Sequence, residues 1–221
     1  MISYNNKMNN ELANHWDNKY SLTETEKLGW YEELPEPSLT LINDCYIDKN
    51  DLIIDVGSGT SKLIDALMST NYTNIIATDI SKIALDKAKK RLQSLIPDKA
   101  ENCQFIIDDI LNPKHIDKLK DVSIWHDRAV FHFLIDEKDQ QKYLQVLKKI
   151  VKKDGYVIIS TFAIGGINTC SGLPVKQYNL EMLIDFLGND FNLVESFNYD
   201  YITTWGQKRP FIYTKFIRIK K

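Results

Sequence analysis

The chain has 221 residues, of which 43% are hydrophobic and 26% are charged, and its formal net charge is −2. These proportions are those of an ordinary globular protein, and a chain of this length can bury a core without disulfides or a structural metal. The slightly negative balance excludes a broad positive field that would attract a phosphate backbone. We therefore expect no nucleic-acid partner.

The cysteines and the N-terminal residues indicate the compartment. Cys45, Cys103 and Cys170 form no CxxC pair or Cys/His cluster with zinc-ligand spacing, so we expect free thiols, a reducing compartment and no metal. Residues 1–14 lack the pattern of a signal peptide, and no apolar run approaches the ~20 residues that span a bilayer. These features predict a cytoplasmic protein, monomeric or homodimeric, with no membrane partner.

Short apolar runs alternate with helical patterns from residue 52 onward. Strands are predicted at 52–56, 74–78, 104–107, 122–125 and 156–162. Between and after them, helices are predicted from Thr60 or Ser61 to residue 68, from a Ser81 cap to residue 92, at 138–152 and at 179–187. This rhythm is typical of a parallel sheet covered on both faces, and right-handed crossovers make it a doubly wound fold.

The end of the chain breaks this rhythm. Two extended segments, 192–201 and 211–219, are separated by a stretch too short for a crossover helix, so they are predicted to pair antiparallel. The sequence thus predicts an α/β fold with a doubly wound, mostly parallel seven-stranded sheet and an antiparallel C-terminal hairpin. With no internal repeat or linker, we expect one domain spanning residues 1–221.

Acidic or glycine-rich residues follow four of the predicted strands. In open α/β sheets, ligands bind outside the carboxyl ends of the strands, so these tips are expected to converge on one cleft. A carboxylate such as Asp79 can there accept hydrogen bonds from both ribose hydroxyls of an adenosine cofactor. The tips are Asp55 with Gly57 and Gly59, Asp79, Asp108 with Asp109, and His126 with Asp127.

The loop after the first strand separates two classes of cofactor. A dinucleotide fingerprint would read G-x-G-x-x-G, whereas residues 57–62 read G-S-G-T-S-K and lack the third glycine. Asp55, inside the strand, also suits a cofactor with an ammonium group better than one with a pyrophosphate. A nicotinamide-dependent oxidoreductase is therefore the disfavoured alternative.

Three segments resemble the motifs of class I methyltransferases that use S-adenosylmethionine (SAM). They are residues 53–60 (IIDVGSGT), 77–81 (ATDIS) and 105–110 (FIIDDI), and the likeness runs in order over about residues 11–219. The resemblance implies SAM as the cofactor and S-adenosylhomocysteine (SAH) as its product. It also implies that Gly57 and Gly59 line the methionine moiety, with Asp55 near its amino group.

The same resemblance assigns the adenosine moiety of SAM. Asp79 would hold the ribose and Ile80 would pack on the adenine ring. Asp109 would accept a hydrogen bond from the adenine amino group, with the backbone of Ile110 at a ring nitrogen. The alternative for Asp55 and Asp109 is that each caps a neighbouring helix.

The N-terminal segment extends the resemblance. Residues 15–20 (HWDNKY) and 29–31 (GWY) are similar to the lid of a subgroup that includes eukaryotic seven-stranded lysine methyltransferases. This implies an N-terminal helical lid over residues 1–35, in which Tyr20 and Trp30 close over the methionine tail. Trp16, one helical turn before Tyr20, is interpreted as packing the helix onto the core.

Residues 125–132 (WHDRAVFH) bear on the acceptor. Lysine methyltransferases of this subgroup carry an acid-basic-Gly-Thr sequence here. Asp127-Arg128 matches its first half, but Ala129-Val130 replaces the second, which argues against a lysine acceptor. His126 and Asp127 are the candidate general bases, with His126 also beside the cofactor, and His132 could assist.

A SAM-dependent methyltransferase acting on a small molecule is the leading hypothesis, with a protein side chain as the second choice of acceptor. The alternative is a SAM-binding protein without transferase activity, serving as a sensor or partner subunit. The long loop at 163–174 and residues 205–206 are candidates for the wall of the acceptor pocket. Cys170 in that loop is interpreted as a buried thiol rather than a nucleophile.

Overall fold

The computed structural model describes residues 2–220 and the side chains of residues 11–220, so Met1 and Lys221, the ends of the expected domain, lie outside it. Seven strands form one sheet in the order β3-β2-β1-β4-β5-β9-β8. Strands β1 to β5 run parallel, and β9 pairs antiparallel with both β5 and β8. The strands are β1 (Ile53–Val56), β2 (Ile75–Asp79), β3 (Cys103–Ile107), β4 (Val122–Arg128), β5 (Val151–Phe162), β8 (Phe191–Ile202) and β9 (Lys208–Arg218).

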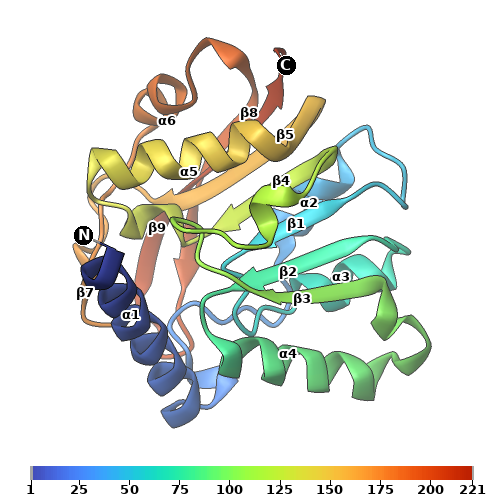
Figure 1. Cartoon of the computed structure of the whole chain (residues 1–221), viewed down its shortest axis with the longest axis vertical. Helices are drawn as coiled ribbons and strands as arrows, with labels where there is room; N and C mark the ends of the chain where they lie inside the picture. The colour runs from blue at the N-terminus through green and yellow to red at the C-terminus, as the bar shows by residue number, and fades with distance from the viewer. Residues whose placement is uncertain (1, 221) are drawn as a thin grey trace.

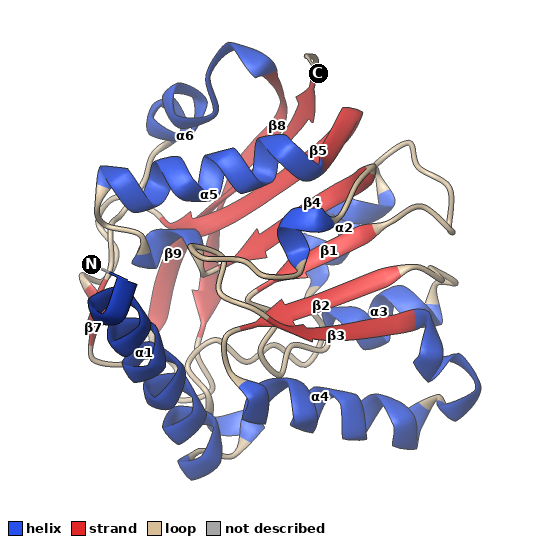
Figure 2. Ribbon diagram, viewed as in Figure 1, coloured by secondary structure: helices blue, strands red, loops and turns tan. Residues whose placement is uncertain are grey.

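Helices cover both faces of this sheet (Figure 2), as the predicted doubly wound fold requires. One face packs against α2 (Glu36–Asn43), α3 (Leu63–Ser69) and α4 (Lys82–Leu95), and the other against α5 (Glu137–Ile150) and α6 (Leu180–Leu187). Short 3-10 turns complete the helical content: η1 (Thr25–Lys27), η2 (Pro97–Asn102), η3 (Ile116–Lys118), η4 (Phe131–Phe133) and η5 (Gly188–Asp190). The predicted fold class is confirmed, including the antiparallel hairpin of β8 and β9.

Side-chain alternation along β4 decides which residues can reach which face. Ile124 belongs to the core under α2 and α3, whereas Trp125 belongs to the core under α5. Because successive side chains in a strand point to opposite faces, His126 and Arg128 lie with Ile124, and Asp127 lies with Trp125. The strand is three residues longer than predicted, so these three residues lie within it rather than in a loop after it.

A buried hydrogen-bonded chain attaches α5 to the sheet. The indole Nε1 of Trp125 donates to the Tyr143 hydroxyl at 2.8 Å, and that hydroxyl donates to Asp127 Oδ2 at 2.8 Å. Asp127 Oδ1 accepts from the backbone N–H of Val130 at 3.0 Å. All three side chains are fully buried, and burial raises the pKa of Asp127 to about 6.

The structure contains elements that the sequence patterns did not predict. Helix α2 lies before β1, and the long loop after β5 holds a small hairpin of β6 (Thr169–Cys170) and β7 (Leu173–Pro174). Asp154-Gly155 does not end a helix-to-strand turn, because β5 already begins at Val151. It forms an irregular stretch of β5, with Asp154 at φ +63° and a register shift opposite Val122/Ile124.

The first helix, α1 (Ile2–Leu22), lies beside the carboxyl ends of the parallel strands (Figure 1). Its Asp17 carboxylate accepts from the Ser81 hydroxyl at 2.6 Å and from the Ile83 backbone N–H at 3.0 Å. Lys87 of α4 donates to the Tyr20 carbonyl at 2.5 Å. These contacts fix α1 across the N-terminal end of α4. Within residues 2–220, neither this helix nor a later one is apolar over enough length to cross a bilayer.

We predict that Tyr143→Phe destabilises the protein by at least about 2 kcal/mol, because it leaves the Asp127 carboxylate and the Trp125 N–H without their buried partner. The loss should be largest above about pH 6 and shrink below it, since protonation removes the charge that Tyr143 stabilises. Urea unfolding at pH 8 and pH 5 measures both effects.

The matched control is Tyr46→Phe, because Tyr46 is 96% exposed and should change the free energy of unfolding by less than about 0.5 kcal/mol. An equal loss in both variants, or a loss independent of pH, would contradict the role given to this hydrogen-bonded chain.

Candidate active site

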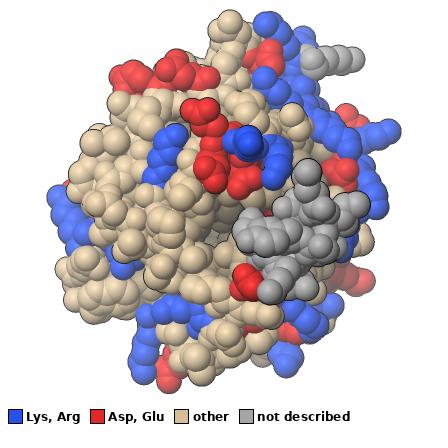
Figure 3. Space-filling model, turned by 60° about the vertical axis from the view of Figure 1, so that its left-hand side comes forward, with Lys and Arg blue, Asp and Glu red and all other residues tan. Residues whose placement is uncertain are grey.

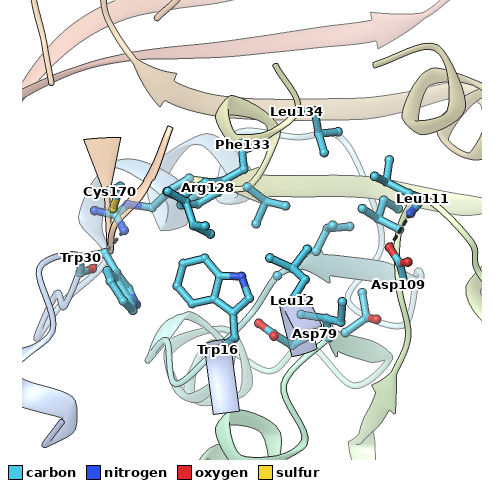
Figure 4. A pocket seen from close by; sticks show the side chains of 18 of the residues that line it. Leu12, Trp16, Trp30, Asp79, Asp109, Leu111, Arg128, Phe133, Leu134 and Cys170 are labelled. Carbon is cyan, nitrogen blue, oxygen red and sulfur yellow. Dashed lines mark hydrogen bonds between the residues drawn. The ribbon is translucent and has the colours of Figure 1, made fainter. Parts of the chain in front are cut away.

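The carboxyl ends of β1 to β4 enclose a cavity beneath α1. In Figure 4, Asp79 and Asp109 lie at one end of it, and Arg128, Cys170 and Trp30 lie at the other. A second, smaller hollow adjoins it and shares Trp30, Gly57 and Arg128 with it. Residues from the ends of these strands and from the N-terminal segment therefore line one cavity. The walls of the second hollow also include Asp55, Ser58, Thr60, Ser38 and His126.

The turn after β1 requires glycine at two positions. Gly57 has φ +62°, and a Cβ there would lie 2.0 Å from Val130 Cγ2. Gly59 has φ +54°, and a Cβ there would lie 2.3 Å from the Tyr20 hydroxyl oxygen. Both positions thus combine a left-handed backbone with a close approach that a side chain would block. Gly57 lines both hollows, whereas Gly59 lines neither and instead makes room for Tyr20.

Asp79 occupies the end of β2 and is 8% exposed. Its Oδ2 accepts from the Gly59 N–H and its Oδ1 from the Ser81 N–H, each at 2.8 Å. Each carboxylate oxygen keeps a free lone pair toward the cavity that Asp79 lines. Burial, opposed by these two backbone donors, raises the pKa of Asp79 to about 6.

Asp55 and His126 form a buried pair on adjacent strands. His126 Nδ1 lies 2.6 Å from Asp55 Oδ1, and His126 Nε2 lies 2.9 Å from the Ser38 hydroxyl. The imidazole is held at both nitrogens, so it orients Asp55 and has no free nitrogen for an acceptor. The other carboxylate oxygen of Asp55, Oδ2, is buried and has no hydrogen-bond partner among the described residues.

The two acids after β3 have different surroundings. Asp108 also lines the cavity, but its carboxylate is occupied by the backbone N–H groups of residues 114–116, at 2.8–3.1 Å. Asp109 is half-buried and lines the cavity, and its Oδ1 accepts from the Leu111 N–H at 2.9 Å. Asp109 therefore caps its own turn and still faces the cavity, beside Ile80 and Ile110.

An aromatic cluster forms the lid. Tyr20 is 5% exposed, and its ring lies 5.9 Å from the Trp30 ring in an edge-on contact. Trp16 contacts Trp30 at 5.8 Å and Phe133 at 5.2 Å, both edge-on. All four residues line the cavity, so Trp16 belongs to the cavity wall in addition to packing α1 onto the core.

None of the three candidate bases lines the larger cavity, and His126 lines only the smaller hollow. Asp127 lines neither hollow, and its carboxylate faces α5, so the geometry does not support it as a base. His132 is fully buried, stacks on Phe162 at 4.4 Å, and lies outside the set of cavity-lining residues. Burial, followed by the nearby charges of Arg128 and Arg209, lowers the pKa of His132 to about 3.

Two arginines of the cavity were not predicted as site residues. Arg128 ends β4, and Arg209 lies near the start of β9. The positions of Arg128 and Arg209 in the sequence do not predict that both line one cavity. Arg128 does stand next to the residues proposed as bases. Among the described residues, no group of three or more His, Cys, Asp or Glu side chains is placed to hold a metal ion.

Solved structures share this fold across almost the whole chain. A SAM-dependent methyltransferase from Anabaena variabilis aligns with a TM-score of 0.70 at 16% identity, covering 94% of this chain and 95% of that one. The [4+2]-cyclase SpnF aligns with a TM-score of 0.71 at 10% identity, covering 96% and 97%. At these identities the likeness concerns the fold alone.

Sequence comparisons add the family. EEF1A lysine methyltransferase 2 from Danio rerio is 24% identical over 120 residues, which is 52% of this chain and 49% of that protein. The chain thus matches about half the length of this curated relative. The family model described as a methyltransferase domain matches residues 47–202, more than half of the chain. The chain therefore belongs to this methyltransferase-domain family, and its fold is that of solved SAM-dependent methyltransferases.

Proposed function

We propose that this enzyme methylates a small-molecule acceptor in the cavity beneath α1, with SAM held by the tips of β1, β2 and β3. The observation that carries the small-molecule assignment is the aromatic roof. Trp16, Tyr20 and Trp30 pack against one another directly over the cavity. A roof of this kind suits an acceptor that is enclosed whole.

The groups left unpaired at the strand tips fit the polar parts of SAM. Asp55 Oδ2 is a buried acceptor without a partner among the described residues, and it matches the ammonium group of the methionine moiety. The glycine turn gives the backbone room for close approach, and Asp79 offers its remaining lone pairs to the ribose hydroxyls. Ile80, Asp109 and Ile110 line the far end, where the adenine ring would lie.

When bound, SAM would supply a methyl group from its sulfonium: the acceptor atom would bond to the methyl carbon in line with the breaking carbon–sulfur bond, and SAH would leave. The residues of this chain then contribute mainly by holding the acceptor in position and excluding water. His126 acts in this scheme as a positioning residue, because both of its nitrogens are engaged with Asp55 and Ser38. A nucleophile without a proton to lose needs no general base.

The charge distribution supports an acceptor other than a nucleic acid. On the face shown in Figure 3, acidic side chains lie beside the basic ones near the middle of the view, basic side chains gather along its upper right edge, and the formal net charge of the chain is −2. A protein lysine acceptor is the second candidate, favoured by the lysine methyltransferase to which half of the chain is similar. The same lid residues, within the expected segment 1–35, would then have to open for a long side chain.

We predict that Asp79→Ala weakens SAH binding by about 1.5–3 kcal/mol, because the ribose loses a carboxylate acceptor. For the unaltered protein, affinity should fall as the pH drops below about 6, where Asp79 becomes protonated and offers fewer lone pairs. Isothermal titration between pH 5 and pH 8 measures both effects.

Asp98→Ala, at an exposed position on η2, is the matched control and should bind SAH like the unaltered protein. If the folded, unaltered chain binds neither SAM nor SAH, the cofactor assignment is wrong. If Asp79→Ala binds as tightly as the unaltered chain at every pH, the ribose contact belongs to another residue.

We further predict that Gly59→Ala weakens SAH binding at least about tenfold, because the new methyl group displaces Tyr20 and with it the lid. Gly188→Ala is the control, since Gly188 also has a positive φ, +67°, but a Cβ there meets no atom within 4 Å. Both variants strain the backbone, so only a difference in SAH affinity, measured by titration, supports the role of the Tyr20 contact. Equal affinities would refute it.

A further inference from the structure

We propose that the methyl acceptor is a small organic monoanion, most simply a carboxylate, whose charge is held between Arg128 and Arg209. This inference deepens the proposed function and rests on it for the identity of the reaction. It concerns the end of the cavity away from Asp79 and Asp109, where Arg128 lies with Cys170 and Trp30 (Figure 4).

Two nitrogens of the Arg128 guanidinium have partners, and the third, Nη2, has none. Its Nε donates to the Tyr213 hydroxyl at 3.0 Å and lies 3.1 Å from Glu32 Oε2, and its Nη1 donates to the Trp30 carbonyl at 3.1 Å. Its Nη2 is buried and has no partner among the described residues. Since a buried donor without a partner costs free energy, a ligand atom that accepts from Nη2 would be favoured.

Arg209 has no carboxylate partner within the described side chains. Its Nη1 donates to the Gly29 carbonyl at 3.1 Å and its Nη2 to Gln207 Oε1 at 3.4 Å, both neutral acceptors. Its Nε, like Arg128 Nη2, is buried and has no hydrogen-bond partner among the described residues. Gly29 permits this placement, because a Cβ there would lie 2.9 Å from Arg209 Nη1.

The two guanidinium groups are anchored to one short segment of the chain. Arg128 and Arg209 donate to the carbonyls of Trp30 and Gly29, which are consecutive residues about 3.8 Å apart at their Cα atoms. Burial is the main cause of the lowered pKa of the His132 imidazole, and the charges of both arginines lower that pKa further. Two like charges in one partly buried place repel each other, and an anion between them relieves that repulsion.

The charge count selects the class of anion. Arg128 and Arg209 contribute two positive charges, and Glu32 contributes one negative charge through its 3.1 Å ion pair with Arg128. The excess of one positive charge matches a monoanion better than a phosphate dianion, and it opposes an ammonium group such as that of lysine. The rest of this end is apolar, with walls from Phe162, Leu173 and Phe211.

The test is isothermal titration of the full chain with four probes that share a phenyl ring: benzoate, phenyl phosphate, benzamide and benzylamine. Each titration is run with the protein saturated with SAH and again without SAH. We expect benzoate to bind at least about tenfold more tightly than benzamide, more tightly than phenyl phosphate, and benzylamine to give no measurable binding.

The variant Arg209→Gln, titrated at saturating SAH, should lose the preference for benzoate over benzamide. The matched control is Lys208→Gln, which removes the same charge one residue away, from an exposed side chain paired with Asp200 outside the cavity. It should keep the full preference. Arg209→Lys retains the charge but loses the planar set of N–H donors, so it should keep part of the preference for benzoate over benzamide.

The outcomes separate the two proposals. If SAH binds and benzoate is not preferred over benzamide, the anion site is refuted and the methyltransferase cofactor site stands. If benzoate is preferred and SAH does not bind, the cofactor assignment fails instead. Tighter binding of phenyl phosphate overturns the assignment to a monoanion, and tighter binding of benzylamine favours the lysine acceptor.

Discussion

One carboxylate, Asp79, connects the parts of the molecule that form the site. Its two oxygens accept from Gly59, in the turn after β1, and from Ser81, at the start of α4. The Ser81 hydroxyl in turn donates to Asp17 of α1. A single buried group therefore fixes the glycine turn, the first turn of α4 and the position of the lid helix. Because burial raises its pKa to about 6, this connection depends on the ionisation of one side chain.

The two ends of the cavity carry side chains of opposite charge. Acids lie where the ribose and adenine of SAM are proposed to bind, and two guanidinium groups lie at the other end. The lid segment touches both regions, since Trp30 packs on Tyr20 while its carbonyl receives Arg128. Fold alone does not assign an acceptor, because one scaffold serves many substrates. The choice of acceptor therefore depends on cavity side chains that the fold does not determine.

Much of the fold and part of the site could be predicted from the sequence, because local patterns determine them. The strand runs, the glycine turn and the Ser81 cap are each encoded within a few residues, and Ser81 does cap α4 by accepting from Ala84. Asp127 shows where such reasoning fails: β4 continues to Arg128, and one step along a strand turns a side chain to the opposite face. The approach of Arg128 to Arg209 depends on how β9 is placed in the sheet, which no local pattern encodes.

The placement of β9 has a consequence for how the chain reaches its folded state. This strand inserts between β5 and β8, although it follows both in the chain. During synthesis, β5 is thus made well before the strand that covers its edge, and until then its unpaired backbone is open to other chains. Phe211 and Arg209 arrive with β9, so that wall of the cavity is built late. Variants that weaken the hairpin should therefore affect the yield of soluble protein before they affect affinity for SAM.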